Sequence, residues 1–246
     1  CRTSSSASRP IEMSLWGIEL WAASMLFARF GAMIMLMPGF GEPAIPARVR
    51  LGLALAVTIC LAPALSDRLP EMPADAFGGV GMIVGEVLIG LIVGASARLL
   101  MSSLATAGQI MGLESGLSFA QTADPTMNGT GQLFSVFLGL MGVALIFATG
   151  LHHLFLQGMA GTYSVFAPGG EAPVGDAAAL AVEMTSRSFR VAFQIVAPLV
   201  VAGLIFRLGL GALARLIPTI QVFFVALPLQ LLGAFVVIAL GLSTGM

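Results

Sequence analysis

Six stretches of this chain are apolar over about the 20 residues that a helix needs to cross a bilayer. They cover residues 15–37, 51–65, 79–101, 133–151, 191–208 and 220–242. Only 9% of the 246 residues are charged and 58% are hydrophobic, whereas charged residues make up roughly 25% of a soluble domain. This number of charged residues is too small to cover a water-exposed surface. The sequence therefore predicts an all-α membrane protein with about six hydrophobic helices.

The connections between these runs differ in character. Residues 38–50 are rich in Gly and Pro, residues 66–76 carry the charges of a solvated loop, and residues 160–182 contain Gly and Pro that favour irregular structure. The run 51–65 is short and contains Pro63, so we expect it to cross incompletely or to form one arm of a hairpin. We expect residues 1–12 to be a non-native or disordered extension and residues 13–246 to form one helical membrane domain.

Composition and motifs argue against several function classes. The net charge is −1, so the chain has no excess of basic residues with which to bind the phosphates of DNA or RNA. Nucleic acid is therefore not an expected partner. Zincin, nucleophile-elbow and P-loop motifs are absent from the sequence. Adjacent His152 and His153 point in different directions on a helix, so they are poor candidates for ligands of one metal ion. Cys1 and Cys60 suit neither a disulfide framework nor a metal cluster. We therefore predict no enzyme activity, no metal and no cofactor.

Four ionisable residues interrupt the apolar runs: Glu19, Arg29, Glu86 and Arg98. An ionisable group facing hydrocarbon costs at least roughly 2.5 to 3.5 kcal/mol, so each should face protein or water. On an ideal helix Glu19 does not share a face with Arg29, nor Glu86 with Arg98. Their partners must therefore lie on other helices or other subunits. These residues form either a polar pathway for ions or protons, or interhelical pairs and interfacial groups, and the second reading is favoured.

Glycine pairs occur at helical spacing in the third apolar run. Gly81 with Gly85, and Gly90 with Gly94, form small-xxx-small pairs. Such pairs let the backbone of another helix approach closely. Dense helix packing is the expected consequence.

Residues 108–125 combine glycines with polar side chains. Glycines recur every four residues, with three aliphatic residues roughly opposite: Gly108, Gly112 and Gly116, then Ile110, Leu113 and Leu117. Each glycine lowers helix propensity by about 1 kcal/mol relative to alanine. The segment also contains polar residues that do not suit a lipid-facing span: Gln109, Glu114, Ser118 and Gln121. We therefore expect an interior hairpin or a movable constriction loop.

Three segments resemble the FliR/SctT family of type III protein-export gate subunits, in order and in spacing. The first reads PGFGEPAIPARVRLGL at 38–53. The second runs from EVLIG at 86–90 through GQIMGL at 108–113 and GLSFA at 116–120 to Asp124-Pro125. The third joins RLIP at 215–218, QVFF at 221–224 and LP at 227–228. The resemblance covers nearly everything from Met13 onward.

The resemblance implies a fold and a set of partners. It implies helical hairpins similar to a fusion of FliP-like and FliQ-like chains, with a glycine-rich plug loop at about 108–125. It also implies assembly with FliP, FliQ and FlhB in the bacterial inner membrane, within the flagellar basal body. The resulting export gate passes unfolded flagellar proteins across that membrane, and the remaining surface contacts membrane lipid.

The resemblance also assigns residues to two groups. The pore and plug residues are Gly108, Ile110, Met111, Gly112, Leu113, Gly116, Leu117, Ser118, Phe119, Asp124 and Pro125. The family-motif and assembly residues are Arg29, Pro38, Glu42, Pro46, Arg48, Glu86, Gly90, Pro218 and Pro228.

Three alternative functions compete with the flagellar gate. The homologous SctT subunit of a virulence injectisome would have the same chain chemistry. A small-solute transporter would show an inverted repeat, and none is visible in the charge or glycine pattern. An intramembrane enzyme needs a nucleophile with a base, or metal ligands, and only the histidine pair offers a candidate.

Overall fold

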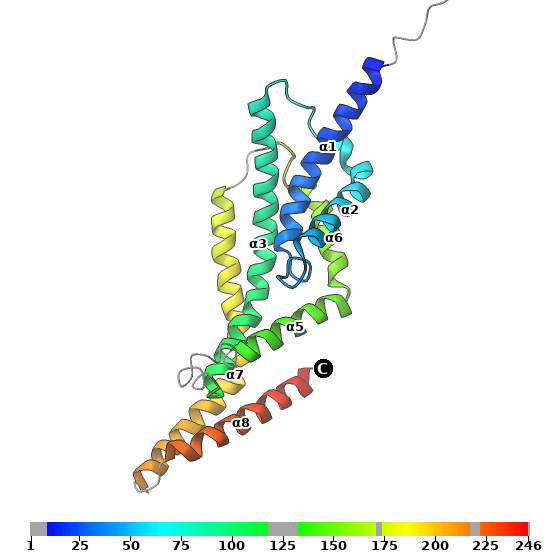
Figure 1. The fold of residues 1–246 in the computed structure, drawn as a ribbon. Coiled ribbons are helices and arrows are strands. Elements are labelled where there is room, and N and C mark those ends of the chain that lie inside the picture. Colours follow the sequence, from blue (N-terminus) through cyan, green and yellow to red (C-terminus); the bar gives the residue numbers. More distant parts are fainter. Residues whose placement is uncertain (1–8, 118–131, 171–173, 217–221, 246) are drawn as a thin grey trace, which may run out of the picture. The chain divides into compact units, whose positions relative to one another are not determined.

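The computed structural model describes residues 9–117, 132–170, 174–216 and 222–245. In these residues the chain forms seven α-helices and one short 3-10 helix, and no strand (Figure 1). The helices are α1 (Arg9–Leu36), α2 (Ala47–Leu65), η1 (Ser66–Arg68), α3 (Ala76–Glu114), α5 (Leu133–Ala148), α6 (Leu151–Val165), α7 (Val174–Leu216) and α8 (Val222–Gly245). The predicted all-α class is confirmed. Because α1 begins at Arg9, residues 9–12 of the predicted extension are helical.

Several helices have the length and apolarity of membrane spans. Among the described residues, three pass this test alone: Ala47–Arg68, Ala76–Glu114 and Gly175–Leu216. α5 and α6 pass it together but are bent by 76° at Gly150, whose φ is +74°. Residues 51–65 belong to the first of these stretches, Ala47–Arg68, so they are part of a segment long enough to cross, and incomplete crossing or a hairpin arm stays a prediction. α2 begins before that run, at Ala47, and ends with it at Leu65, where η1 follows directly. Pro63 lies inside α2 without ending it.

The chain divides into two compact units. Unit 1 comprises Cys1–Arg98 and Leu145–Val182, and unit 2 comprises Leu99–Ala144 and Glu183–Met246. α3, α5 and α7 each contribute residues to both units. The single membrane domain expected for residues 13–246 stays a prediction.

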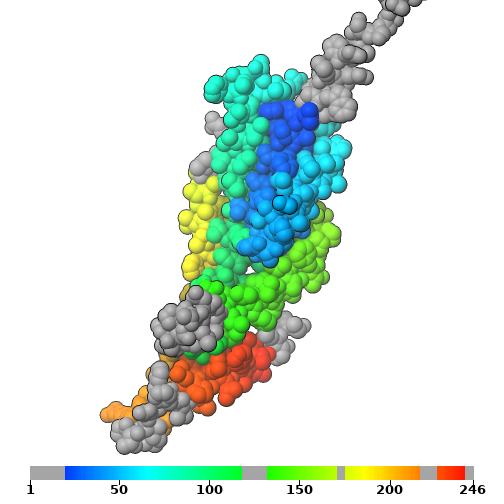
Figure 2. Space-filling model, viewed as in Figure 1, coloured from blue at the N-terminus to red at the C-terminus, as the bar shows by residue number. Residues whose placement is uncertain are grey.

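In unit 1, α1 packs along α2 (Figure 2). Phe30 and Ile34 of α1 lie in a buried core with Ala54 of α2 and Met159 and Tyr163 of α6. The rings of Phe30 and Tyr163 meet edge to face, with centroids 5.8 Å apart. This core brings the inner faces of α1, α2 and α6 together, next to the charged cluster described below.

The glycine pairs of α3 differ in their surroundings. A Cβ atom on Gly90 would overlap the carbonyl oxygen of Arg29, and one on Gly94 would lie 3.0 Å from the carbonyl oxygen of Met33. Gly81 has no atom within 4 Å of its Cβ position, and Gly85 has only the Gly170 oxygen, at 3.4 Å. The predicted close helix approach is therefore confirmed at Gly90 and Gly94, where α1 crosses α3, and not at Gly81.

Unit 2 has a core of its own. Met111 of α3 and Phe134 of α5 are buried in it with Val196 and Leu199 of α7 and Ala234 of α8. A Cβ atom on Gly108 would overlap the backbone of Ser135. α3 and α5 therefore touch backbone to backbone at this point.

Two expectations about irregular segments need correction. α3 continues through Glu114, so residues 108–114 are helical rather than part of a loop. The close contact at Gly108 explains this, because tertiary packing outweighs low helix propensity. Residues 151–165 form α6, and α7 begins at Val174, so the irregular structure described within the predicted segment 160–182 is confined to residues 166–170. The core contacts of Met159 and Tyr163 stabilise α6 despite its polar residues.

Candidate functional site

Arg29 of α1 and Glu86 of α3 form an ion pair inside unit 1. Both side chains have an exposed fraction of 0%. The guanidinium donates from Nε to Glu86 Oε2 at 2.5 Å and from Nη2 to Oε1 at 2.9 Å. This bidentate arrangement is among the strongest available to an arginine and a carboxylate. It confirms that each residue has its partner on another helix, as the favoured reading of the sequence required.

The remaining polar atoms of this cluster also have partners. Arg29 Nη1 donates to the Phe166 oxygen at 3.2 Å, and the Gly169 N–H donates to Glu86 Oε1 at 3.2 Å. The Tyr163 hydroxyl donates to Glu86 Oε2 at 3.3 Å, and the Tyr163 ring centroid lies 3.8 Å from the guanidinium carbon. The cluster therefore joins α1, α3, α6 and the turn after α6. Such a set of contacts holds three helices in one arrangement.

Glycine is needed for this pairing. Gly90 lies one turn after Glu86 on α3, and its missing side chain lets the backbone of α1 approach at Arg29. The same approach brings the guanidinium within direct hydrogen-bond distance of the carboxylate. Two residues of the predicted assembly group, Glu86 and Gly90, thus act on the same contact with α1.

Replacing Tyr163 with phenylalanine should destabilise the protein by about 1 kcal/mol, because one hydrogen bond is lost while the ring remains over the guanidinium. Tyr163→Leu should cost more, since it also removes the ring. Thermal unfolding of the purified protein in detergent measures both changes. Equal losses in the two variants would contradict a contribution from the ring.

The other two ionisable residues of the apolar runs are placed differently. Arg98 is exposed, and its Nη1 donates to the Gly41 oxygen at 3.5 Å, which agrees with the interfacial reading. The side chain of Glu19 lies outside the described residues.

A second polar cluster lies at the C-terminal end of α3, in unit 2. Gln230 of α8 donates from Nε2 to the Glu114 carbonyl oxygen at 2.5 Å, and Arg207 of α7 pairs with Glu114 Oε2 at 2.9 Å. Two residues later Gly116 has φ +81°, and its N–H donates to the Leu113 oxygen at 3.2 Å. A glycine in this left-handed conformation is a common helix terminator. The helix therefore ends where the sequence can turn and where two other helices bind its last residue.

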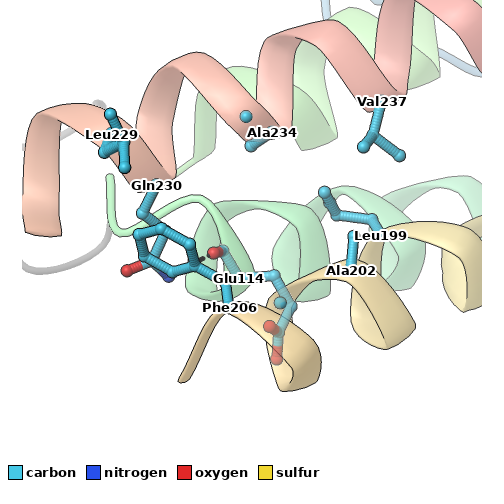
Figure 3. A pocket seen from close by; sticks show the side chains of 10 residues that line it. Glu114, Leu199, Ala202, Phe206, Leu229, Gln230, Ala234 and Val237 are labelled. Atoms are coloured by element: carbon cyan, nitrogen blue, oxygen red, sulfur yellow. Dashed lines mark hydrogen bonds between the residues drawn. The ribbon is translucent and has the colours of Figure 1, made fainter. Parts of the chain in front are cut away.

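A cavity of about 130 Å³ lies beside this cluster, mainly between α7 and α8 (Figure 3). Apart from Glu114 and Gln230, its lining is apolar. It consists of Leu199, Ala202, Gly203, Phe206, Leu229, Gly233, Ala234 and Val237.

The predicted plug residues lie partly on α3. Gly108, Met111 and Gly112 are buried, Ile110 and Leu117 pack against the unit 2 core, and Leu113 is 59% exposed. Gly116 follows the helix end, close to Leu227 and Gln230. The other four residues of the plug group lie outside the described residues: Ser118, Phe119, Asp124 and Pro125. Pro218 of the assembly group also lies outside them.

Four of the remaining assembly residues lie in the segment that leads into α2 or in its first turn. Pro38 is buried, Glu42 is half-buried and Arg48 is exposed, while Pro46 is the N-cap residue of α2. Pro228 is exposed inside α8. The structure therefore brings Arg29 together with Glu86 and Gly90, but not with these residues.

Sequence reasoning missed three partners in the two clusters: Tyr163, Arg207 and Gln230. Gln230 carried a usable signal, because a glutamine in the apolar run 220–242 needs a hydrogen-bond partner as Arg29 does. Tyr163 is the single tyrosine of the chain, but no spacing rule links it to Glu86.

Comparison with known proteins identifies the family. The family described as "Bacterial export proteins, family 1" matches residues 20–246. The chain belongs to this family. It is 43% identical to the flagellar biosynthetic protein FliR of Caulobacter vibrioides, over 92% of this chain and 90% of that one. It is 32% identical to FliR of Escherichia coli K12, over 81% and 76%, and 22% identical to the Yop proteins translocation protein T of Yersinia pestis, over 84% and 80%.

Membership in this family makes the chain a membrane-embedded subunit of a type III protein-export gate. The flagellar reading is favoured over the injectisome reading, because identity to the flagellar relatives is higher than identity to translocation protein T. Bacterial export proteins of family 1 are structural gate components and not a known family of enzymes.

Proposed function

We propose that this chain assembles with FliP-, FliQ- and FlhB-type subunits in the inner membrane of the flagellar basal body, and that unfolded flagellar proteins pass through the assembled gate. The observation that carries the proposal is the 43% identity to a flagellar FliR over 92% of the chain. The helical hairpins would then correspond to FliP-like and FliQ-like parts. Exposed apolar residues of α2 and α7, such as Leu55 and Leu204, support burial against lipid or other subunits.

Within this gate we assign residues 108–125 to the closure of the pore. The feature that supports a movable element is Gly116, where α3 ends in a backbone conformation that few other residues adopt. Leu113 and Leu117 flank this turn and supply apolar surface that can block a channel. Ion or proton passage through the Arg29 cluster is not favoured, because the charges of Arg29 and Glu86 pair with each other.

Gly116→Leu should reduce export of flagellar proteins by about tenfold or more, because a leucine at φ +81° costs on the order of 1 to 3 kcal/mol. The assay is flagellin secretion and motility in a strain that lacks this gene and is complemented with each variant. Gly139→Leu is the matched control, since Gly139 in α5 has no atom within 4 Å of its Cβ position.

The same strains test the assignment itself. Wild type and Gly139→Leu should restore swimming and Gly116→Leu should not. A deletion strain that swims and secretes flagellin normally would exclude the flagellar role, and the match to translocation protein T would then direct the search to injectisome substrates.

A further inference from the structure

Met111 anchors the last turn of α3 in the unit 2 core, but the final residue of the helix is attached to its neighbours by polar contacts. Its terminal carbonyl accepts a hydrogen bond from Gln230 of α8, and the Glu114 carboxylate pairs with Arg207 of α7. These bonds join residues that are far apart in the chain, on three different helices. Each can be broken by moving one side chain, without unpacking the core around Met111.

From this geometry we infer that Glu114, Arg207 and Gln230 form a releasable latch, which holds the end of α3 on α7 and α8 while the export gate is closed. The inference rests on the proposed function, because it assigns the latch to that gate. It concerns residues outside the family-motif group and adds a specific mechanical role to the end of α3.

Comparison with the Arg29–Glu86 pair shows why this contact is releasable. The unit 1 pair is fully buried and has additional partners, whereas the side chains of Arg207 and Glu114 are 51% and 14% exposed. An exposed ion pair is weak because water and salt screen it. The two pairs are therefore suited to different roles, the first to a permanent joint and the second to a contact that opens.

The packing around the latch supports the same conclusion. The adjacent cavity of about 130 Å³ is lined in part by residues with little or no side chain: Ala202, Gly203, Gly233 and Ala234. Interlocking of large side chains normally resists movement of one helix over another. Here α7 and α8 leave open volume next to Glu114 (Figure 3), so the Glu114 side chain has space to move when its polar contacts break.

Gly203 offers a way to open the latch without removing a charge. A Cβ atom at Gly203 would overlap Glu114 Oε2, the same oxygen that accepts from Arg207. That oxygen is the end of a flexible side chain, so Gly203→Ala should push the carboxylate aside and leave the backbone in place. Alanine also favours the helix more than glycine does, so α7 itself should not be weakened.

The test uses the full chain in the assembled gate in cells, with small-solute leak across the membrane as the readout. Gly203→Ala and Glu114→Gln should raise the leak about fivefold or more, as expected for loss of roughly 1 kcal/mol of attachment. Gly209→Ala is the matched control on α7, because its Cβ position has no atom within 4 Å. The double variant Glu114→Arg with Arg207→Glu keeps opposite charges at the two positions. It should therefore return the leak toward the wild-type level.

A second measurement separates the latch from the export assignment. Spin labels at Leu113 and Leu229, which are 59% and 56% exposed, report the distance between the α3 end and α8 in the purified gate with Cys1 and Cys60 replaced by serine. Gly203→Ala should broaden this distance distribution, and Gly209→Ala should not. This outcome does not depend on which proteins the gate exports.

A broadened distribution together with a raised leak supports the latch, even if the deletion strain swims and the flagellar assignment fails. An unchanged distribution in Gly203→Ala overturns the latch. A broadened distribution with a wild-type leak shows that the contact does not keep the gate closed, and overturns its proposed role.

Discussion

Replacing Arg29 with methionine should lower the free energy of unfolding by about 3 to 5 kcal/mol, because it leaves the Glu86 carboxylate buried without its counter-charge. The side chain of Glu86 is fully buried, so water does not replace the lost partner. Tyr163 and Gly169 each donate one hydrogen bond to this carboxylate, and these bonds do not neutralise the charge.

The measurement is thermal unfolding of purified protein, followed by tryptophan fluorescence. Trp21 is a suitable reporter of unit 1, since it is 9% exposed and its Nε1 donates to the Pro70 oxygen at 3.1 Å. Arg187→Met is the matched control. Arg187 pairs with Glu183 on the surface, where the side chains are 61% and 53% exposed, so its loss should change stability by about 1 kcal/mol or less.

The double variant Arg29→Met with Glu86→Leu tests the cause of the loss. Replacement of a whole buried ion pair by apolar residues of similar size is often neutral or stabilising. The double variant should therefore recover most of the stability that Arg29→Met loses. If it is less stable than Arg29→Met, the pair contributes through its attraction and not through the cost of an unpaired charge.

The buried pair shows how far sequence reasoning extends. Hydrophobic runs and the cost of a charge in hydrocarbon were enough to predict that Arg29 and Glu86 have partners on other helices. They did not predict that the two residues pair with each other, because they are 57 positions apart and the whole of α2, with a connection on either side, lies between them. Pairing across such a distance depends on how α1 crosses α3, which Gly90 makes possible.

The end of α3 shows the opposite case. Glycine spacing directed attention to residues 108–125, and Gly116 does end the helix. The same glycines led to the wrong prediction of a loop at 108–114, because propensity describes an isolated helix whereas Gly108 packs on the backbone of Ser135. A glycine that weakens a helix in isolation and a glycine that permits close packing look identical in one sequence.

Gly90→Ala should destabilise unit 1 by about 1 to 3 kcal/mol, because the added methyl group is forced against packed backbone. Its Cβ would overlap the Arg29 oxygen and lie 2.8 Å from the Ala32 Cβ. Neither atom is the end of a flexible side chain, so α1 must move away from α3 and the Arg29–Glu86 geometry must change with it. Helix propensity acts in the other direction, since alanine is favoured over glycine by about 1 kcal/mol.

Gly81→Ala isolates the propensity effect, since it is the same substitution in the same helix and unit with no atom within 4 Å. This variant should be as stable as wild type or more stable by up to about 1 kcal/mol. The difference in unfolding temperature between the two variants, followed by Trp21 fluorescence, then measures the cost of separating α1 from α3. Equal stability of Gly90→Ala and Gly81→Ala would mean that α1 moves freely on α3, and the buried ion pair would then have to hold the two helices without backbone contact.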